Sequence, residues 1–281
     1  MTPAPDAALL AASRKAWADL EAIHVVGYFA EQSTAAYVEL GLHPQLSYFA
    51  ARSAAFGEAS PELTVATFYN FAPWLVHAAL PAAWQSASPD QVLEARLQGV
   101  GRALRSVLGD PDVTEALTLA RRVCDDLSPA GRPLYAAHAA LPWPEDDLLA
   151  LWHAATLVRE HRGDGHIAVL QLAALDPVEA TVVGGLWAQT TSFLRKTRGW
   201  SDEEYAGAED RLRDRGWLDA DGALTAEGTA QRQQVEDRTD ALAVEAWAGI
   251  GVEGATRLHE LLGPMRRTVL GSGLLPGGRR G

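Results

Sequence analysis

The chain has 281 residues, a formal net charge of −12, nine tryptophans and one cysteine. Hydrophobic residues make up 48% and charged residues 21% of the chain, which is typical of a globular protein and excludes a mostly disordered one. The acidic balance argues against a broad nucleic-acid interface, because phosphate groups require a basic surface. Cys124 has no cysteine partner, so we expect no internal disulfide and an inert thiol.

The remaining composition predicts a mainly α-helical protein of the cytoplasm. Many apolar positions are alanine, which favours helices. The N-terminus lacks the basic and then apolar pattern of a signal peptide, and no apolar run reaches the roughly 18 residues of a membrane span. We therefore expect no membrane partner. At this length the chain holds either two domains or one duplicated unit.

Capping residues mark the expected helices. A capping residue precedes proline at Ser60, Ser88, Asp110, Ser128 and Asp176. Ser201 and Glu204 have the spacing of a capping box, and Thr225 is expected to cap a later helix. Glycines 41, 57, 109 and 216 suit left-handed C-terminal caps. In chain order, helices are predicted over residues 6–40 with a break around Gly27, 44–56, 61–86 with a break at Pro73, 89–108, 111–126, 129–140, 144–161, 165–174, 177–198 with a weak point at Gly184-Gly185, 202–215, 226–248 and 253–271.

One segment differs from this helical pattern. Residues 217–224 contain two short apolar pairs around an Asp-Gly turn, which predicts a small β-hairpin. A helix, a hairpin and a helix follow one another over residues 197–242. With Arg215-Gly216 at the first helix end and Leu224-Thr225 at the next helix start, this segment resembles the winged helix-turn-helix of the MarR family. The resemblance implies that residues 202–215 form a recognition helix and that the hairpin forms the wing.

A weak internal repeat suggests that the unit is duplicated. Arg52, Gly57, Pro73, Trp84 and Ser88 run parallel to Arg159, Gly163, Pro177, Trp187 and Ser201, although alanine-rich helices also produce chance matches. The expected fold class is mainly α, with tandem winged-helix-like units resembling a single-chain MarR dimer and one small β-hairpin wing. The expected parts are a degenerate winged-helix-like half at 1–140, a MarR-like half at 141–271 and a flexible tail at 272–281.

The charge of the candidate recognition helix argues against sequence-specific DNA binding. Residues 202–215 carry six acidic residues against three arginines, and the wing tip carries Asp219 and Asp221 without a basic residue between them. Basic residues occur at Arg195, Lys196, Arg198 and Arg266-Arg267, which we interpret as solvated helix ends. Binding of DNA is therefore not expected.

The densest polar cluster is REHRGDGH at residues 159–166. Gly163 and Gly165 predict a tight turn around Asp164, flanked by His161 and His166. Two imidazoles and a carboxylate suit a divalent metal, or a histidine general base oriented by Asp164. Arg159 and Arg162 suit a clamp for an anion. The structural alternative is a helix corner in which Asp164 caps the next helix and an arginine pairs with Glu160.

A second polar cluster lies in the first half. Glu21, His24 and Tyr28 share one face of an apolar helix, and an aromatic segment around Tyr69 follows at residues 68–74. If the repeat is real, Arg52 is the counterpart of Arg159, and the two halves enclose a pocket. The alternative is that His24 and Tyr28 are core residues with satisfied hydrogen bonds.

REHRGDGH, together with Tyr28-Phe29, residues 68–71 (FYNF) and residues 80–84 (LPAAW), resembles a family of uncharacterised actinobacterial proteins labelled helix-turn-helix or MarR-like. This resemblance covers nearly the whole chain and implies a fold but no established reaction. MarR-like proteins hold aromatic ligands at the junction of their dimerisation helices and winged domains. The resemblance therefore implies a pocket at such a junction.

These observations lead to three functional hypotheses. The preferred one is a small-molecule-binding protein, monomer or homodimer, with an aromatic or anionic ligand and weak or absent DNA binding. The alternative is an enzyme of actinobacterial specialised metabolism, with His161, Asp164 and His166 as metal ligands or acid–base groups. The third is a MarR-like transcription regulator. The predicted ligand-binding residues are His24, Tyr28, Tyr69, Trp152, His153, Arg159, Glu160 and Arg162.

Overall fold

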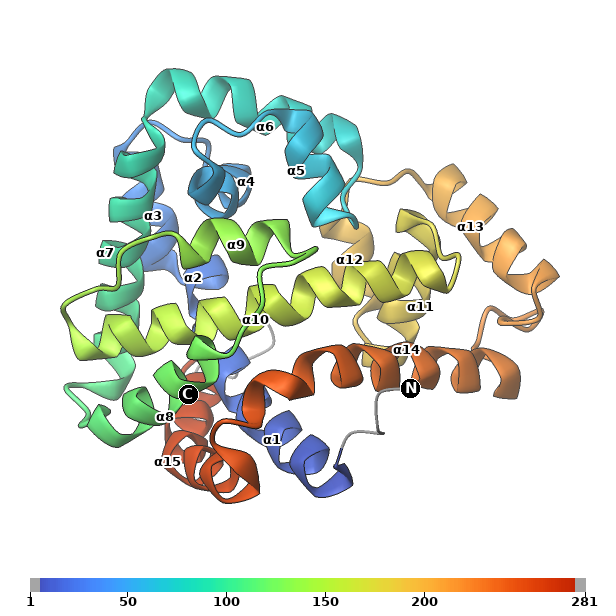
Figure 1. Ribbon diagram of the computed structural model, residues 1–281. Helices are drawn as coiled ribbons and strands as arrows, with labels where there is room; N and C mark the ends of the chain where they lie inside the picture. The colour runs from blue at the N-terminus through green and yellow to red at the C-terminus, as the bar shows by residue number, and fades with distance from the viewer. Residues whose placement is uncertain (1–5, 276–281) are drawn as a thin grey trace.

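The computed structural model describes residues 6–275, which fold into α-helices joined by short loops and contain no β-strand (Figure 1). The α-helices are α1 (Ala7–His24), α2 (Val26–Phe29), α3 (Glu31–Glu39), α4 (Ser47–Ser53), α5 (Pro61–Phe68), α6 (Pro73–Ser86), α7 (Pro89–Leu108), α8 (Thr114–Asp125), α9 (Pro133–Ala139), α10 (Asp147–Leu172), α11 (Pro177–Ala188), α12 (Thr191–Thr197), α13 (Asp202–Asp214), α14 (Ala226–Ala243) and α15 (Gly251–Gly271). Short 3₁₀ turns follow α4 at Ala54–Phe56 and α14 at Val244–Trp247. The expected mainly α fold is confirmed.

Three hydrophobic clusters form the core, and α10, which crosses the middle of the molecule, contributes to the first and the third (Figure 1). The first cluster joins α1, α7, α8, α10 and α15. The second lies among α3, α4, α6 and α7, and the third joins the end of α10 to α11, α13 and α14. The first cluster draws residues from both predicted halves, so α10 is a shared core element. The division at residues 140 and 141 stays a prediction.

Most predicted helix boundaries are confirmed because the capping chemistry is local. Ser88, Asp176 and Ser201 each form a full capping box, and Ser60 and Thr225 cap their helices as expected. The four predicted glycine caps all have positive φ. Four predicted starts are three or four residues early: the helices expected from residues 44 and 144 begin at Ser47 and Asp147. The helix expected after Asp110 begins at Thr114, and the helix expected after Ser128 begins at Pro133.

The predicted tight turn at Gly163-Asp164-Gly165 is wrong. α10 continues without a break from Asp147 to Leu172. Glycine disfavours helix by about 1 kcal/mol, but packing of α10 against helices on several sides outweighs this cost. A Cβ atom at Gly165 would collide with the guanidinium of Arg132, so a larger residue there would force that side chain to shift. That guanidinium donates a hydrogen bond to the carbonyl of His161.

The predicted wing is reduced to a turn closed by a single antiparallel β-bridge between Leu218 and Leu224. The Asp-Gly turn forms as expected, and Asp219 Oδ1 accepts hydrogen bonds from the backbone N–H groups of Asp221 and Ala223. One bridge is too short for a strand, so residues 6–275 contain no hairpin of the predicted kind. The helix predicted over 177–198 also breaks at Gln189, which has φ 57°, and not at Gly184-Gly185.

Within the described residues no single helix is long and apolar enough to cross a membrane, although α10 and α11 pass that test together as a pair bent by 111°. The predicted flexible tail falls partly outside the description, since residues 276–281 are not described. Ser272 ends α15, and Leu274 and Leu275 pack on the first hydrophobic cluster.

Candidate functional site

The three residues predicted to share a metal or acid–base site do not converge. On the continuous α10 helix, His161 packs edge-on against the ring of Tyr135, and Asp164 accepts a hydrogen bond from the backbone N–H of Tyr135. His166 lies on another face and bonds to the Thr239 hydroxyl at 2.9 Å. No three His, Cys, Asp or Glu side chains within residues 6–275 are grouped to hold a metal ion. The predicted triad is therefore not assembled.

Burial explains the titration of these groups. It raises the pKa of Asp164 to about 6, and the hydrogen bond from Tyr135 N–H opposes this shift only in part. Burial lowers the pKa of His161 to about 3 and that of His166 to about 4. Both imidazoles are neutral at pH 7. Because the two imidazoles lie apart from each other, their neutrality results from burial in the core and not from a shared site.

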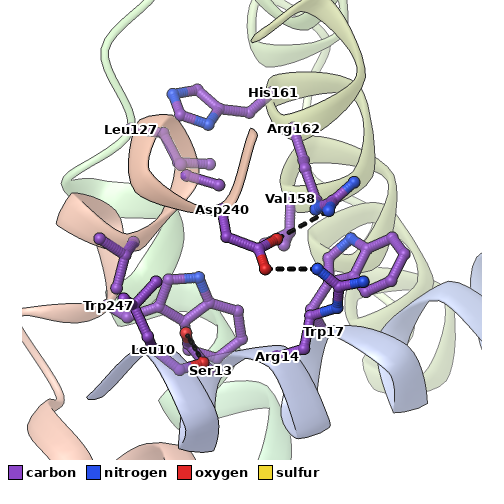
Figure 2. A pocket seen from close by; sticks show the side chains of 12 residues that line it. Leu10, Ser13, Arg14, Trp17, Leu127, Val158, His161, Arg162, Asp240 and Trp247 are labelled. Atoms are coloured by element: carbon purple, nitrogen blue, oxygen red, sulfur yellow. Dashed lines mark hydrogen bonds and ion pairs between the residues drawn. The ribbon is translucent and has the colours of Figure 1, made fainter. Parts of the chain in front are cut away.

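Arg162, predicted to clamp an anion from a ligand, pairs with carboxylates of α14. Its Nη2 lies 2.7 Å from Asp240 Oδ1 and 3.1 Å from Glu236 Oε2. Figure 2 shows Asp240 between the guanidinium groups of Arg162 and Arg14, beside a cavity of about 20 Å³. That volume holds about one water molecule. This network joins α1, α10 and α14, and it is structural.

Glu160 is the centre of a second buried cluster, the Glu160 cluster, formed with Tyr28, Arg52 and Arg159. Arg52 binds the carboxylate in bidentate fashion, with Nε–Oε1 at 2.9 Å and Nη2–Oε2 at 2.7 Å. Arg159 Nη1 lies 2.8 Å from Oε2. Burial alone would raise the pKa of Glu160, but Arg159 and Arg52 outweigh it and hold the pKa well below its usual value. Arg52 therefore meets the 159–160 segment in an internal ion pair, and Arg159 pairs with Glu160 as the structural alternative expected.

His24 extends this cluster by hydrogen bonds. Its Nε2 lies 2.8 Å from the Tyr28 hydroxyl, which lies 3.1 Å from Glu160 Oε1. Its Nδ1 lies 3.0 Å from Thr156 Oγ1. Burial, reinforced by Arg159, holds the pKa of His24 well below 6.5. His24 and Tyr28 share one helix face as predicted, and their polar atoms are satisfied inside the protein.

Thr156 leads from His24 to a cavity of about 230 Å³, which we name the Arg96 cavity. Its polar wall is formed by Arg96 on α7, His138 on α9, and His153 and Thr156 on α10. Trp152, a set of apolar side chains and the exposed acidic residues Asp90 and Glu94 also line it. The apolar side chains are Leu93, Leu97, Leu141, Pro142 and Pro144. These polar groups therefore come together from three helices, and Arg96 lies 42 residues before His138 in sequence.

Arg96 is a buried cation without an acidic partner. Its side chain is 3% exposed and lies over the ring of Trp152 at 4.8 Å. Within residues 6–275 it forms no ion pair, and its buried Nη2 atom has no hydrogen-bond partner. Arginine remains protonated even when buried, so its charge is uncompensated.

The two histidines of the cavity are neutral. His138 Nδ1 donates to the Leu134 carbonyl at 2.9 Å, so its Nε2 accepts the hydrogen bond from Arg96 Nη1 at 2.9 Å. Burial, reinforced by Arg96, lowers the pKa of His138 to about 3 and that of His153 to about 4. His153 Nε2 is also buried and without a partner. The cavity thus has one buried positive charge and unsatisfied polar atoms next to an apolar wall, and the exposed acidic residues Asp90 and Glu94 also line it.

The spacing of apolar residues along α7 indicates that Arg96 is buried. The buried face of α7 includes Val92, Gly99, Val100 and Ala103, and Arg96 falls on the same face at helical spacing. A charged residue on an otherwise apolar stripe is buried by the fold and requires a partner. Of the predicted ligand-binding residues, Trp152 and His153 line the Arg96 cavity. Tyr69 lies elsewhere and donates to the Leu175 carbonyl at 2.5 Å.

The arginines of α13 and its flanks pair with nearby acids. Arg211 Nη2 lies 2.6 Å from Asp176 Oδ2, and Arg213 Nη1 lies 2.7 Å from Asp210 Oδ1. Arg215 Nη1 lies 3.3 Å from Glu179 Oε2. The acidic residues of the first turn of α13, from Asp202 to Glu204, are exposed. The outward charge of this helix is therefore negative.

Two further expectations have definite outcomes. Arg198, expected at a solvated helix end, is half-buried over the ring of Phe71 at 4.5 Å, so this interpretation is wrong. Cys124 is buried and forms no disulfide, as expected, and burial raises the pKa of its thiol to about 12.

Comparison with known proteins gives one match. A model described as a helix-turn-helix family matches residues 13–276. The matched segment contains the Glu160 cluster, the Arg96 cavity and α13. No curated protein and no solved structure matches the chain.

Proposed function

The chain belongs to a helix-turn-helix family, and we propose that it binds a small organic carboxylate in the Arg96 cavity. One observation carries the proposal: Arg96 is a buried arginine without an acidic partner beside a cavity of about 230 Å³. A carboxylate supplies the missing negative charge and accepts two hydrogen bonds from a guanidinium. Binding therefore removes an electrostatic cost that the unliganded fold carries.

The size and walls of the cavity favour an aromatic or otherwise compact apolar body. An apolar cavity of about 150 Å³ holds benzene, so about 230 Å³ holds a ring with a carboxylate. Trp152 and the leucine and proline side chains of the wall provide apolar contact. Neutral His153 offers a further hydrogen bond to the ligand. A monoanion matches the single unpaired charge of Arg96.

The MarR-like, duplicated arrangement remains part of this proposal. The order of α11, α12 and α13, followed by the Leu218–Leu224 bridge and α14, supports a degenerate winged unit. We propose that this unit has lost operator binding, because the exposed acids of α13 repel phosphate and its arginines are paired internally. The acid–base enzyme hypothesis has less support, since His161, Asp164 and His166 do not converge.

Calorimetric titration with benzoate, benzamide and benzylamine tests the proposal. These probes have similar shapes, so only the carboxylate is expected to bind, and the Arg96→Met variant is expected to weaken benzoate binding at least thirtyfold. Arg213→Met, which removes a surface arginine, serves as the matched control and should bind as the wild type does. Equal binding of benzamide and benzoate, or unchanged binding in Arg96→Met, would overturn the proposal.

The regulator hypothesis has a separate test. Fluorescence anisotropy with a labelled random-sequence duplex should show no saturable binding at micromolar protein in low salt. Tight, salt-dependent binding would restore the regulator hypothesis and leave the carboxylate site unaffected.

A further inference from the structure

A second cavity of about 170 Å³ lies between α10, α11 and α14. Its α10 residues, His166 and Leu170, come later in that helix than Thr156. Arg198, which directly follows α12, and Arg232 on α14 line the cavity. Asn70 reaches it from the loop before α6. We name it the Arg198 cavity. It shares no lining residue with the Arg96 cavity.

Polar atoms at this cavity are unsatisfied. Arg232 Nη2 pairs with Glu236 Oε1 at 2.5 Å, but its Nη1 is buried without a partner. Asn70 Oδ1 is also buried without a partner. Arg198 Nη1 donates to the neighbouring Thr197 hydroxyl at 2.8 Å, and Arg198 forms no ion pair with any acid of residues 6–275. The cavity is thus lined by two guanidinium groups with unused donors.

The local charge is positive in an otherwise acidic protein. Glu236 and Asp240 are shared by three arginines, namely Arg14, Arg162 and Arg232. Two carboxylates therefore leave one positive charge over in this network, and Arg198 adds a second. A ligand with two negative charges balances both, whereas a monoanion balances one.

The cavity also offers hydrogen-bond acceptors. Thr239 Oγ1 donates to the Val235 carbonyl at 2.7 Å, so it accepts the hydrogen bond from His166 Nδ1. Neutral His166 therefore keeps Nε2 as an acceptor, and Asn70 Oδ1 is another. Acceptors beside two cationic donors suit a ligand that carries both an anionic group and a hydroxyl group.

We propose that the Arg198 cavity binds the phosphate monoester of a small hydroxylated compound. The phosphate has the two charges and the several oxygens that two guanidinium groups require. A volume of about 170 Å³ accommodates a phosphate with only a few additional atoms, so the carbon body is short. The hydroxyl group donates to Asn70 or His166. The proposal is independent of the carboxylate site.

Calorimetric titration with glycerol 3-phosphate, inorganic phosphate and glycerol tests it. Glycerol 3-phosphate is expected to bind saturably, at least tenfold more tightly than inorganic phosphate, and glycerol should not bind. Arg198→Gln is expected to weaken glycerol 3-phosphate binding at least tenfold, and Arg198→Lys should restore part of the affinity. Absence of saturable binding, or equal affinity for inorganic phosphate, would overturn the proposal.

A variant that fills the cavity separates loss of binding from loss of the fold. Gly184 lines the cavity, and a Cβ atom at this position would meet no heavy atom within 4 Å. Gly184→Leu places a better helix former in α11 and fills the open space, so the melting temperature should be unchanged or higher while binding is lost. Arg96→Met should bind glycerol 3-phosphate as the wild type does. Normal binding in Gly184→Leu would place the ligand elsewhere and contradict the proposal.

Discussion

Arg52 and Arg96 are two buried arginines with similar surroundings and different electrostatic partners. Arg52 is 6% exposed and lies over the ring of Phe68 at 4.4 Å, while Arg96 is 3% exposed and lies over the ring of Trp152 at 4.8 Å. Arg52 has the bidentate carboxylate of Glu160, whereas Arg96 has only a neutral histidine. An aromatic face stabilises a buried cation by roughly 0.5–2 kcal/mol, which is less than the several kcal/mol that its desolvation costs.

This difference separates a structural arginine from a binding arginine. The Arg52–Glu160 pair connects α4 to α10 and satisfies its own charge. Arg96 leaves its charge to be satisfied by a molecule that enters the cavity. A fold that retains such a group loses stability for the sake of binding, which is a common trade-off at functional sites. Four measurements test this comparison.

Lowering the pH should produce the largest effect on the free energy of unfolding, because neutral histidines are buried in the regions of both arginines. The pKa values of His138, His153, His161 and His166 are lowered to about 3 or 4, and that of His24 is also held well below 6.5. The unfolded chain takes up these protons near pH 6.5 and the folded chain does not, so stability falls as the pH drops below 6.5. Asp164, with a pKa raised to about 6, offsets a small part of this loss.

We expect a loss on the order of 5 kcal/mol in the free energy of unfolding between pH 7 and pH 5.5. Urea titrations at half-unit pH steps measure it. Saturating benzoate should move the midpoint of acid unfolding to lower pH in the wild type and not in Arg96→Met. A stability that stays constant to pH 5 would show that the histidines titrate normally in the folded protein.

Removal of Arg52 should produce the second largest effect. Arg52→Met leaves Glu160 buried with only Arg159, and breaking a buried pair costs about 3–5 kcal/mol. For a chain of this size, the melting temperature should fall by roughly 6–15 °C. Differential scanning calorimetry measures this change. The double variant Arg52→Met with Glu160→Leu should recover part of the loss, and a single variant as stable as the wild type would contradict the structural role.

The sequence predicted local structure well for a physical reason. Ser88, Asp176 and Ser201 cap helices by bonds that span three residues, so the necessary information lies within each segment. The 159–166 segment shows the opposite case. Its glycines favour a turn locally, but long-range packing around α10 holds the segment as helix.

The candidate site was less predictable because it combines distant segments. Trp152 and His153 were predicted because they precede the 159–166 cluster at helical spacing, whereas Arg96 and His138 enter through the packing of α7 and α9 on α10. Glu160 and Arg52 were expected near each other, but nothing in the sequence distinguished an ion pair from the wall of a pocket. Only the structure, which shows the partner of each charged group, distinguishes an ion pair from the wall of a pocket.

Replacement of Arg96 should change the stability by less than replacement of Arg52 does, and in the opposite direction. Arg96→Met removes an uncompensated buried charge and retains apolar contact with Trp152, so the unliganded protein should gain about 1 kcal/mol of stability. Thermal melting without ligand, compared with Arg52→Met under the same conditions, measures the contrast. A loss comparable to that of Arg52→Met would mean that Arg96 is structural, and it would remove the basis of the comparison.

Thr156 should produce the smallest effect, and it tests whether the two regions act independently. Its hydroxyl donates to the Trp152 carbonyl, lies 3.0 Å from His24 Nδ1 and lines the Arg96 cavity. Thr156→Val deprives His24 of one partner, which should cost about 1–2 kcal/mol. The charge of Arg96 is unchanged, so benzoate affinity should stay within about twofold of the wild type. Thr156→Ser keeps the hydroxyl and controls for the change in shape. A tenfold loss of affinity in Thr156→Val alone would show that the hydrogen bonds from His24 to Glu160 support ligand binding, and the two arginines would then belong to one coupled network.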